Sequence, residues 1–153
     1  MLETATGVED ITLTLTQEVH VNAPIETTFA ALLDQLGEFN EHPDGTPMPF
    51  NLEPWPGGRW YRDLGDGNGH WWGNVQAIKR PTLVEISGPM FMSYAASNNL
   101  QYRLSEVPGG TLIKFRHSGL GLFEAEHKKN IVTGWSHVHE QAKLRAEKKA
   151  GSK

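Results

Sequence analysis

The sequence predicts an α+β domain in which a curved, seven-stranded antiparallel sheet surrounds one long C-terminal helix. Three observations lead to this fold class. Residues 11–21 alternate apolar and polar side chains, residues 48–118 hold six short segments separated by tight turns, and residues from 122 onward keep helical spacing. A sheet with one apolar face needs a cover, and the last helix has the length to provide it.

Length and composition limit the function. The chain of 153 residues suits one domain, and its net charge of −4 argues against a nucleic-acid partner. Without cysteine, it has no thiolate chemistry, disulfide or Cys-ligated zinc. Its beginning is acidic and polar, and no apolar run approaches the ~20 residues of a membrane span. We expect a cytoplasmic protein with no membrane partner, a flexible N-terminus at 1–10, one domain at 11–148 and a flexible tail at 149–153.

A change of period marks the first strand and helix. In residues 11–21 the apolar side chains point to one face, and Gln17 is among them. A buried amide needs hydrogen-bond partners, so Gln17 is expected to bond to backbone in the core, with ligand contact as the less favoured alternative. Apolar residues then recur at helical spacing over 25–36, and a short second helix fits around 36–41.

Six short strands and a final helix follow. The strands are expected at residues 48–53, 58–64, 69–79, 82–88, 98–106 and 111–118. Most of the segments between them are short and rich in Gly and Pro, as in antiparallel hairpins. The helix is expected at about 122–146, with Ile131, Trp135 and Val138 on its buried face. A gap between sheet and helix is the natural place for a pocket.

Four segments carry a resemblance to a known superfamily: VHVNAPIETTFAALLD, PGGRWYRDLGDGNGHWWGNVQAIKRPTLVEISGP, GGTLIKFRHSGLG and the late Gly134–Trp135 pair. Together they resemble the START-like, or helix-grip, superfamily, which includes polyketide cyclases and plant pollen allergens. Within it, the chain looks like bacterial-type single-domain proteins related to the C-terminal domain of the heat-shock-protein ATPase activator. The resemblance covers about residues 11–145. It implies the helix-grip fold and an inward-facing Trp60, while function varies widely on this scaffold.

The tryptophans have two interpretations. Trp71 and Trp72 are adjacent in a strand, so they must point to opposite faces, and one of them lies inside. The rings fill an ordinary core, or they line an aromatic pocket formed by Trp60, one of the adjacent pair, and Trp135 from the helix.

Charged and polar candidates share these inner faces. Arg62 alternates in phase with the inward tryptophan; a buried guanidinium needs a carboxylate or an anionic ligand, unless the strand end is exposed. His117 is expected on the inner face, where it acts as an acid or base or, as the favoured interpretation, bonds to a buried group. His137 and His139 diverge by about 200° on a helix, so they cannot share zinc, and we expect no metal site and a solvated His137.

The Met-rich connection PMFMSYAA is an adaptable apolar cluster, either packed at an edge strand or at a pocket rim. The full set of candidate ligand-binding residues is Trp60, Arg62, Trp72, Met90, Met92, Tyr102, His117 and Trp135.

These patterns favour a binding module that holds a small apolar or amphipathic ligand between sheet and helix, without a cofactor. Two alternatives stay open. An enzyme of cyclase or hydrolase type would use His117 with water, and a carboxylate or Tyr102 beside that histidine would favour it. A chaperone-related protein-interaction module would be favoured by a closed, filled interior.

Overall fold

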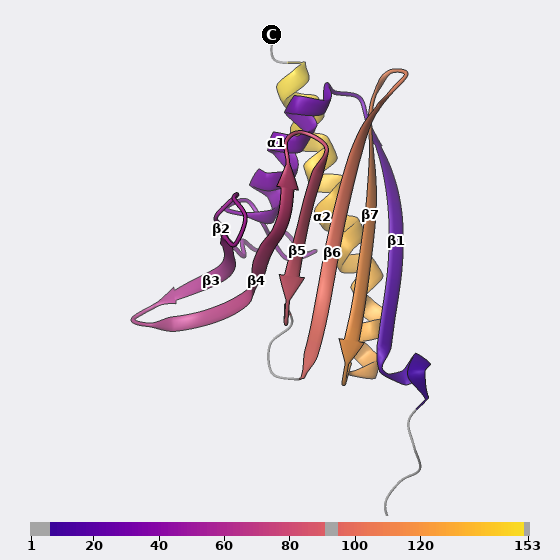
Figure 1. Ribbon diagram of the computed structural model, residues 1–153. Coiled ribbons are helices and arrows are strands. Elements are labelled where there is room, and N and C mark those ends of the chain that lie inside the picture. Colours follow the sequence, from indigo (N-terminus) through magenta and orange to yellow (C-terminus); the bar gives the residue numbers. More distant parts are fainter. Residues whose placement is uncertain (1–6, 91–94, 152–153) are drawn as a thin grey trace, which may run out of the picture.

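The computed structural model describes residues 7–90 and 95–151. Within these residues, seven strands form one antiparallel sheet in the order β1-β7-β6-β5-β4-β3-β2 (Figure 1). The strands are β1 (Thr12–Val21), β2 (Asn51–Leu52), β3 (Arg59–Gly65), β4 (Asn68–Lys79), β5 (Leu83–Gly88), β6 (Ala96–Val107) and β7 (Gly110–Gly121). The helices are the short 3₁₀ turn η1 (Val8–Asp10), α1 (Ile25–Leu36) and α2 (Ala125–Ala150). The predicted α+β fold, with the sheet around a long C-terminal helix, is confirmed.

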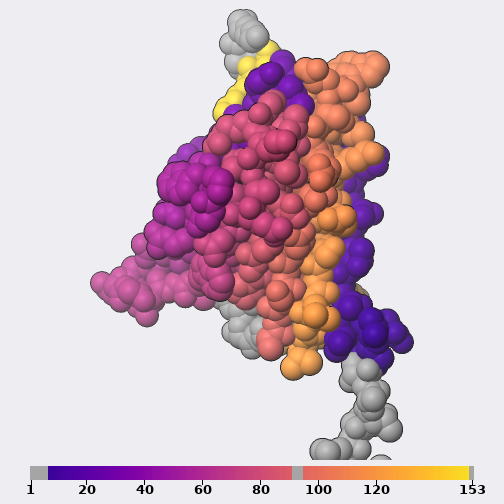
Figure 2. Space-filling model, viewed as in Figure 1, coloured from indigo at the N-terminus to yellow at the C-terminus, as the bar shows by residue number. Residues whose placement is uncertain are grey.

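Both helices cover the same face of the sheet (Figure 1), and Figure 2 shows its opposite face, with the β3–β4 hairpin protruding at one side. Side chains alternate accordingly: in β6, every second residue from Asn98 to Leu104 is buried. Within the described residues, no helix combines the length and the hydropathy needed to cross a bilayer.

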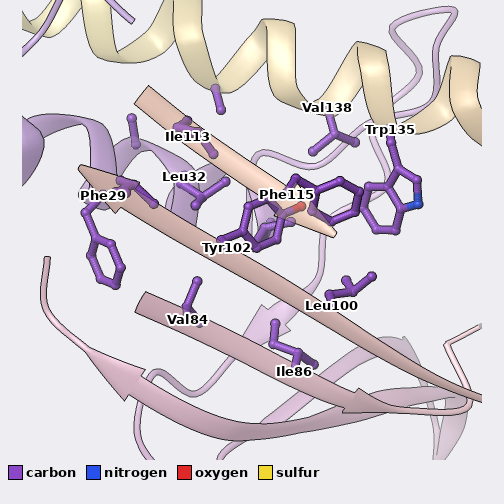
Figure 3. Packing of buried hydrophobic residues seen from close by; sticks show 14 of the residues in the cluster. Phe29, Leu32, Val84, Ile86, Leu100, Tyr102, Ile113, Phe115, Trp135 and Val138 are labelled. Carbon is purple, nitrogen blue, oxygen red and sulfur yellow. The ribbon is translucent and has the colours of Figure 1, made fainter. Parts of the chain in front are cut away.

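The core lies between the central strands and the two helices. Figure 3 shows Tyr102 and Phe115 on the sheet facing Trp135 and Val138 of α2. Ile131 is also buried, so the expected phase of the long helix is correct. At the other end of the core, α1 contributes its own apolar side chains, among them Phe29, Ala31, Leu32 and Leu36.

The short second helix expected around residues 36–41 is not formed. The amide of Gly37 donates to the carbonyls of Leu33 and Asp34 and ends α1, and residues 37–39 are turns. Backbone bonds from Met48 to Asn40 and from Phe50 to Gly37 then fold the segment back on itself. The following prolines lack the N–H that a continuing helix needs, so a turn-rich loop replaces the helix.

Glycines serve the hairpin turns. Asp66 and Gly67, between β3 and β4, both have positive φ, 55° and 78°. This is the backbone of a two-residue type I′ turn, in which Asp-Gly is a preferred pair. The tight turn sends β4 straight back along β3, which places the tryptophans of the two strands side by side.

Candidate functional site

A cavity of about 170 Å³ lies at one end of the helix-covered face of the sheet. Trp60 of β3, Trp72 of β4 and Trp135 of α2 line it. Its other lining residues come from the end of α1, the loop that follows and the first half of α2: Leu36, Asn40, Glu41, His42, Pro43, Met48, His127, Asn130, Ile131, Gly134 and Val138. An apolar cavity of about 150 Å³ is large enough for benzene, so this one suits a single aromatic ring or a short branched alkyl group.

The sheet side of the cavity is a fixed aromatic cluster. Trp60 is 1% exposed, and its ring centroid lies 5.3 Å from that of Trp72, nearly perpendicular to it. Phe50 packs against both rings, at 5.1 and 4.8 Å. The indole Nε1 of Trp60 donates to the carbonyl of Leu36 at 2.7 Å, at the C-terminal end of α1. Because helix-end carbonyls lack intrahelical partners, this bond ties β3 to α1 and fixes the ring.

The structure resolves which of the adjacent tryptophans faces inward. Trp72 packs against the core, whereas Trp71 is 53% exposed on the outer face. Tyr61 pairs with Trp71 but Trp60 pairs with Gly73, so the register shifts by one residue at Trp72. This β-bulge brings Trp72 into the group around Trp60.

A hydrogen bond to His117 fixes the ring of Trp135. The indole Nε1 of Trp135 donates to Nδ1 of His117 at 3.0 Å. The imidazole proton therefore resides on Nε2, which donates to Oδ1 of Asn98 at 2.7 Å, and the Asn98 amide donates to the carbonyl of Pro89 at 3.0 Å. Burial, with a smaller effect of His127, lowers the pKa of His117 to about 4, so the ring is neutral at pH 7. His117 is on the inner face as expected, with both ring nitrogens engaged.

A second buried histidine forms a separate network. Nε2 of His139 lies 2.9 Å from the hydroxyl of Tyr102, and its Nδ1 lies 2.7 Å from Oε1 of Gln17. Gln17 in turn donates to Ser136 at 3.0 Å. Since the Gln17 oxygen accepts, Nδ1 of His139 carries the proton and Nε2 accepts from the tyrosine. Burial lowers the pKa of His139 to about 3 and raises that of Tyr102.

These contacts correct two expectations from the sequence. Gln17 is bonded as a core amide should be, but its partners are the side chains of α2 and not backbone groups. His137 is not solvated: its side chain is 20% exposed, and its Nε2 lies 2.9 Å from Oε1 of Glu41. That contact joins α2 to the loop that forms one wall of the cavity.

The remaining candidates that the structure describes are not among the residues that line the cavity. Met90 is buried and its amide donates to the carbonyl of Trp72. Arg62 is partly buried opposite His70 on β4, and its buried Nε has no hydrogen-bond partner among the described residues; the same holds for Nδ1 of His70. Met92 lies outside the described residues.

Of the eight candidates, three tryptophans line the cavity: Trp60, Trp72 and Trp135. Sequence reasoning missed the loop residues of the wall, because a turn-rich segment has no period that reveals its position. It also missed Gly134, although a glycine inside a helical pattern is itself a signal. An added Cβ at Gly134 would meet no atom within 4 Å. In residues 7–90 and 95–151, no three side chains of His, Asp or Glu converge as metal ligands would.

A sheet wrapped around a C-terminal helix defines a START-like, helix-grip protein. Within this class, the chain belongs to the family described as Activator of Hsp90 ATPase homolog 1-like protein, whose model matches residues 22–146. No protein of curated function matches the sequence significantly.

Solved structures share the fold at low sequence identity. A putative uncharacterized protein from Rhizobium leguminosarum is 20% identical, with a TM-score of 0.68 over 90% of this chain and 95% of that one. The di-domain ARO/CYC protein StfQ of the steffimycin biosynthetic pathway is 12% identical, with a TM-score of 0.68 over 94% of this chain and 53% of that one. Ara h 8.0201 is 15% identical, with a TM-score of 0.64 over 88% of this chain and 97% of that one.

Proposed function

We propose that the protein binds a small apolar ligand, or the apolar part of an amphipathic one, in the cavity between the β3–β4 hairpin, α2 and the loop after α1. The observation that carries the proposal is the cavity itself: about 170 Å³ lined by three indole rings. The fold supports it, since proteins with this pollen-allergen-like fold often bind hydrophobic ligands.

The walls are held in place before any ligand binds. Trp60 is bonded to the end of α1 and Trp135 to His117, so neither ring can turn into the space without breaking a buried hydrogen bond. The cavity is open to solvent, and its lining includes the exposed residues His42, Pro43 and Asn130. An apolar ring that enters it removes the indole surfaces from water without a rearrangement of the walls.

The alternative enzyme has less support. His117 does not line the cavity, and its two nitrogens are occupied by Asn98 and Trp135. Tyr102, which would have favoured catalysis beside His117, is bonded to His139. A general base must reach the proton that it removes, and this arrangement instead makes His117 the support of a tryptophan.

The test uses a substitution on α2 whose larger side chain fills the cavity. Toluene is titrated into the protein while tryptophan fluorescence is followed, because three of the five tryptophans line the cavity. We expect saturable binding to the wild type and at least about tenfold weaker binding to Gly134→Leu, whose side chain would occupy the space. The neighbouring, exposed Thr133→Leu is the matched control and should bind as the wild type does. Absence of saturable binding of benzene, toluene and naphthalene to the wild type would overturn the proposal.

A further inference from the structure

The strand β1 forms one edge of the sheet, and no strand lies beside it on its outer side (Figure 1). Its pairing with β7 shows which backbone groups face this edge. The amide of Gly121 donates to the carbonyl of Ile11 at 2.8 Å, so these two residues form a hydrogen-bonded pair, and such pairs recur at every second residue of an antiparallel ladder. The register then continues without a shift to Val21. The odd-numbered residues of β1 therefore bond to β7, and the even-numbered ones turn their N–H and C=O groups outward: Thr12, Thr14, Thr16, Glu18 and His20.

This edge lacks the features that usually block a free strand. Proteins protect long edges with proline, lysine, a bulge or a covering element. β1 is ten residues long, has the sequence TLTLTQEVHV, and pairs with β7 without a bulge. In residues 7–90 and 95–151, no group bonds to the outward N–H or C=O of Thr14, Thr16 or Glu18. The opposite edge of the sheet is β2, which has only two residues, so a further strand is better added at β1.

A groove follows the same edge on the helix-covered face of the sheet. It is lined by Gln17, Glu18, Val19 and His20 of β1 and by Ser136, His139, Glu140 and Lys143 of α2. Apolar surface continues beyond it, because Leu13 and Leu15 are only partly buried and Val132 of α2 is 47% exposed. Val132 lies one helical turn before Ser136, whose hydroxyl accepts from Gln17, so it faces the same edge. The inward side chains of an added strand would therefore contact apolar surface in addition to the backbone bonds.

We propose that two copies of the chain pair through β1, antiparallel about a two-fold axis at Thr16, so that their sheets join into one continuous sheet. This interface is independent of the proposed ligand site, since the cavity lies at the β3–β4 side of the sheet and β1 is at the opposite edge.

The position of the axis follows from the outward-facing residues. With the axis at Thr16, all five of them pair: Thr12 lies opposite His20 of the second copy, and Thr14 lies opposite Glu18. The pairing forms about ten backbone hydrogen bonds. An axis at Leu15 or Gln17 would instead place one outward-facing residue opposite Asp10 or Asn22, which lie outside β1. The amide of Asn22 is in any case bonded to Glu147. An axis at Glu18 would bring two carboxylates directly opposite each other, which is unfavourable.

The side chains also fit a second copy of the same strand. On the helix-covered face, Leu13 of each copy lies opposite Val19 of the other, so apolar side chains meet at both ends of the pairing. On the outer face, each Glu18 lies opposite a threonine, so no like charges meet. The assembly ends at two copies, because the pairing uses β1 of both and leaves only the two-residue β2 at each outer edge.

The first test measures association and locates it on the chain. Sedimentation velocity of the wild type, from low micromolar to near-millimolar concentration, should show a reversible equilibrium between monomer and dimer. Hydrogen exchange of the backbone amides is then followed by NMR at both ends of this range. The amides of Thr14, Thr16 and Glu18 should exchange at least about tenfold more slowly in the dimer, because pairing gives each of them an acceptor. The exposed turn at Asp66 and Gly67 is the control, and its amides should exchange equally fast at both concentrations.

A proline at the axis should weaken the dimer. Thr16→Pro removes an N–H that faces outward, and proline is tolerated at such positions of an edge strand. The dissociation constant of the dimer should rise by about tenfold or more, because the proline removes hydrogen bonds at the centre of the pairing. Circular dichroism of the dilute protein checks that the monomer keeps its fold.

Two charges at one position test the register without a proline. Thr14→Lys places a cation opposite Glu18 of the second copy, and Thr14→Glu places like charges there. The first variant should tighten the dimer by about twofold or more, and the second should weaken it by about fivefold or more. Both should melt at the wild-type temperature as dilute monomers, since Thr14 is exposed on the outer face.

Each contrary result overturns the inference. A wild-type chain that stays monomeric at every concentration has no such interface. A dimer whose Thr14 and Thr16 amides exchange as they do in the monomer, or which Thr14→Lys and Thr14→Glu affect alike, forms through another surface. Growth beyond two copies would exclude a closed pairing about Thr16. These measurements involve no ligand, so their failure would leave the proposed function of the cavity unaffected.

Discussion

The buried polar groups at the two ends of the region between α2 and the sheet differ in their hydrogen bonding. Around His117 and His139, which we call the filled end, every ring nitrogen has a partner and the neighbouring side chains of Leu100, Tyr102 and Phe115 are buried. Around Trp60 and Trp72, the open end, a cavity remains and Oδ1 of Asn40 has no hydrogen-bond partner among the described residues. The difference teaches that the two buried histidines here belong to the scaffold, and that the proposed ligand site lies where aromatic side chains border an open cavity.

Trp135 connects the two ends. Its ring packs against Phe115 at 5.0 Å on the filled side and lines the cavity on the other. Its indole N–H bonds to His117, so the polar network determines the position of the cavity wall. Substitutions around His117 and His139 are therefore expected to alter the cavity by moving the ring of Trp135.

The strongest test of this connection is Trp135→Ala. Removal of a buried tryptophan costs about 3–5 kcal/mol, and here His117 also loses the donor to Nδ1. The free energy of unfolding should fall by that amount in urea titrations. Trp71→Ala, at an exposed position, should change it by less than about 1 kcal/mol. Equal effects of the two substitutions would mean that Trp135 is not part of the core.

The filled end should also make the fold sensitive to acid. The pKa of His117 is lowered to about 4 and that of His139 to about 3, both mainly by burial, from an ordinary value of 6.5. The unfolded chain therefore takes up protons first as the pH falls. The stability due to the neutral rings is complete above pH 6.5 and is lost as the pH falls toward 4 and 3. We expect a loss on the order of 3 kcal/mol between pH 7 and 5.

Urea unfolding at several pH values measures this loss, and NMR titration of the imidazole signals assigns it. Glu53 contributes little above pH 5: hydrogen bonds with Arg59 lower its pKa from 4.5 to about 2, but above pH 5 its carboxyl is mostly ionised in the unfolded chain as well. A stability that is constant from pH 7 to 5 would contradict the prediction. So would imidazole signals of His117 and His139 that titrate near 6.5.

The smallest expected change in stability comes from alanine substitutions at two glycines, which should have opposite signs. An added Cβ at Gly134 meets nothing within 4 Å, so Gly134→Ala should stabilise the protein by about 0.5–1 kcal/mol through helix propensity alone. At Gly119, in the filled end, the same methyl group would lie 2.5 Å from Oδ1 of Asn98, and Gly119→Ala should destabilise. Thermal unfolding of both variants measures the contrast. If Gly134→Ala destabilises the protein, the space beside α2 is not open.

The sequence determined the fold to a large extent. The period of two in residues 11–21 and the helical period after 122 are local patterns, so they predicted β1, α2 and the buried face of Trp135 without knowledge of partners. The turn residues predicted the antiparallel order, and strand alternation together with the family resemblance placed Trp60 inside. The register shift that turns Trp72 inward depends on pairing between two strands, which alternation within one strand cannot reveal.

Only the tertiary structure determined which partners the buried polar groups bond to and where the cavity lies. Gln17 and His139 are 122 positions apart, and no local pattern indicates that their side chains meet. The loop after α1 has no period, so its position as a cavity wall, with Asn40 inside, follows from the folded chain alone. Hydrogen bonds and voids depend on which surfaces come together in three dimensions, whereas strand and helix periods depend on neighbours along the chain.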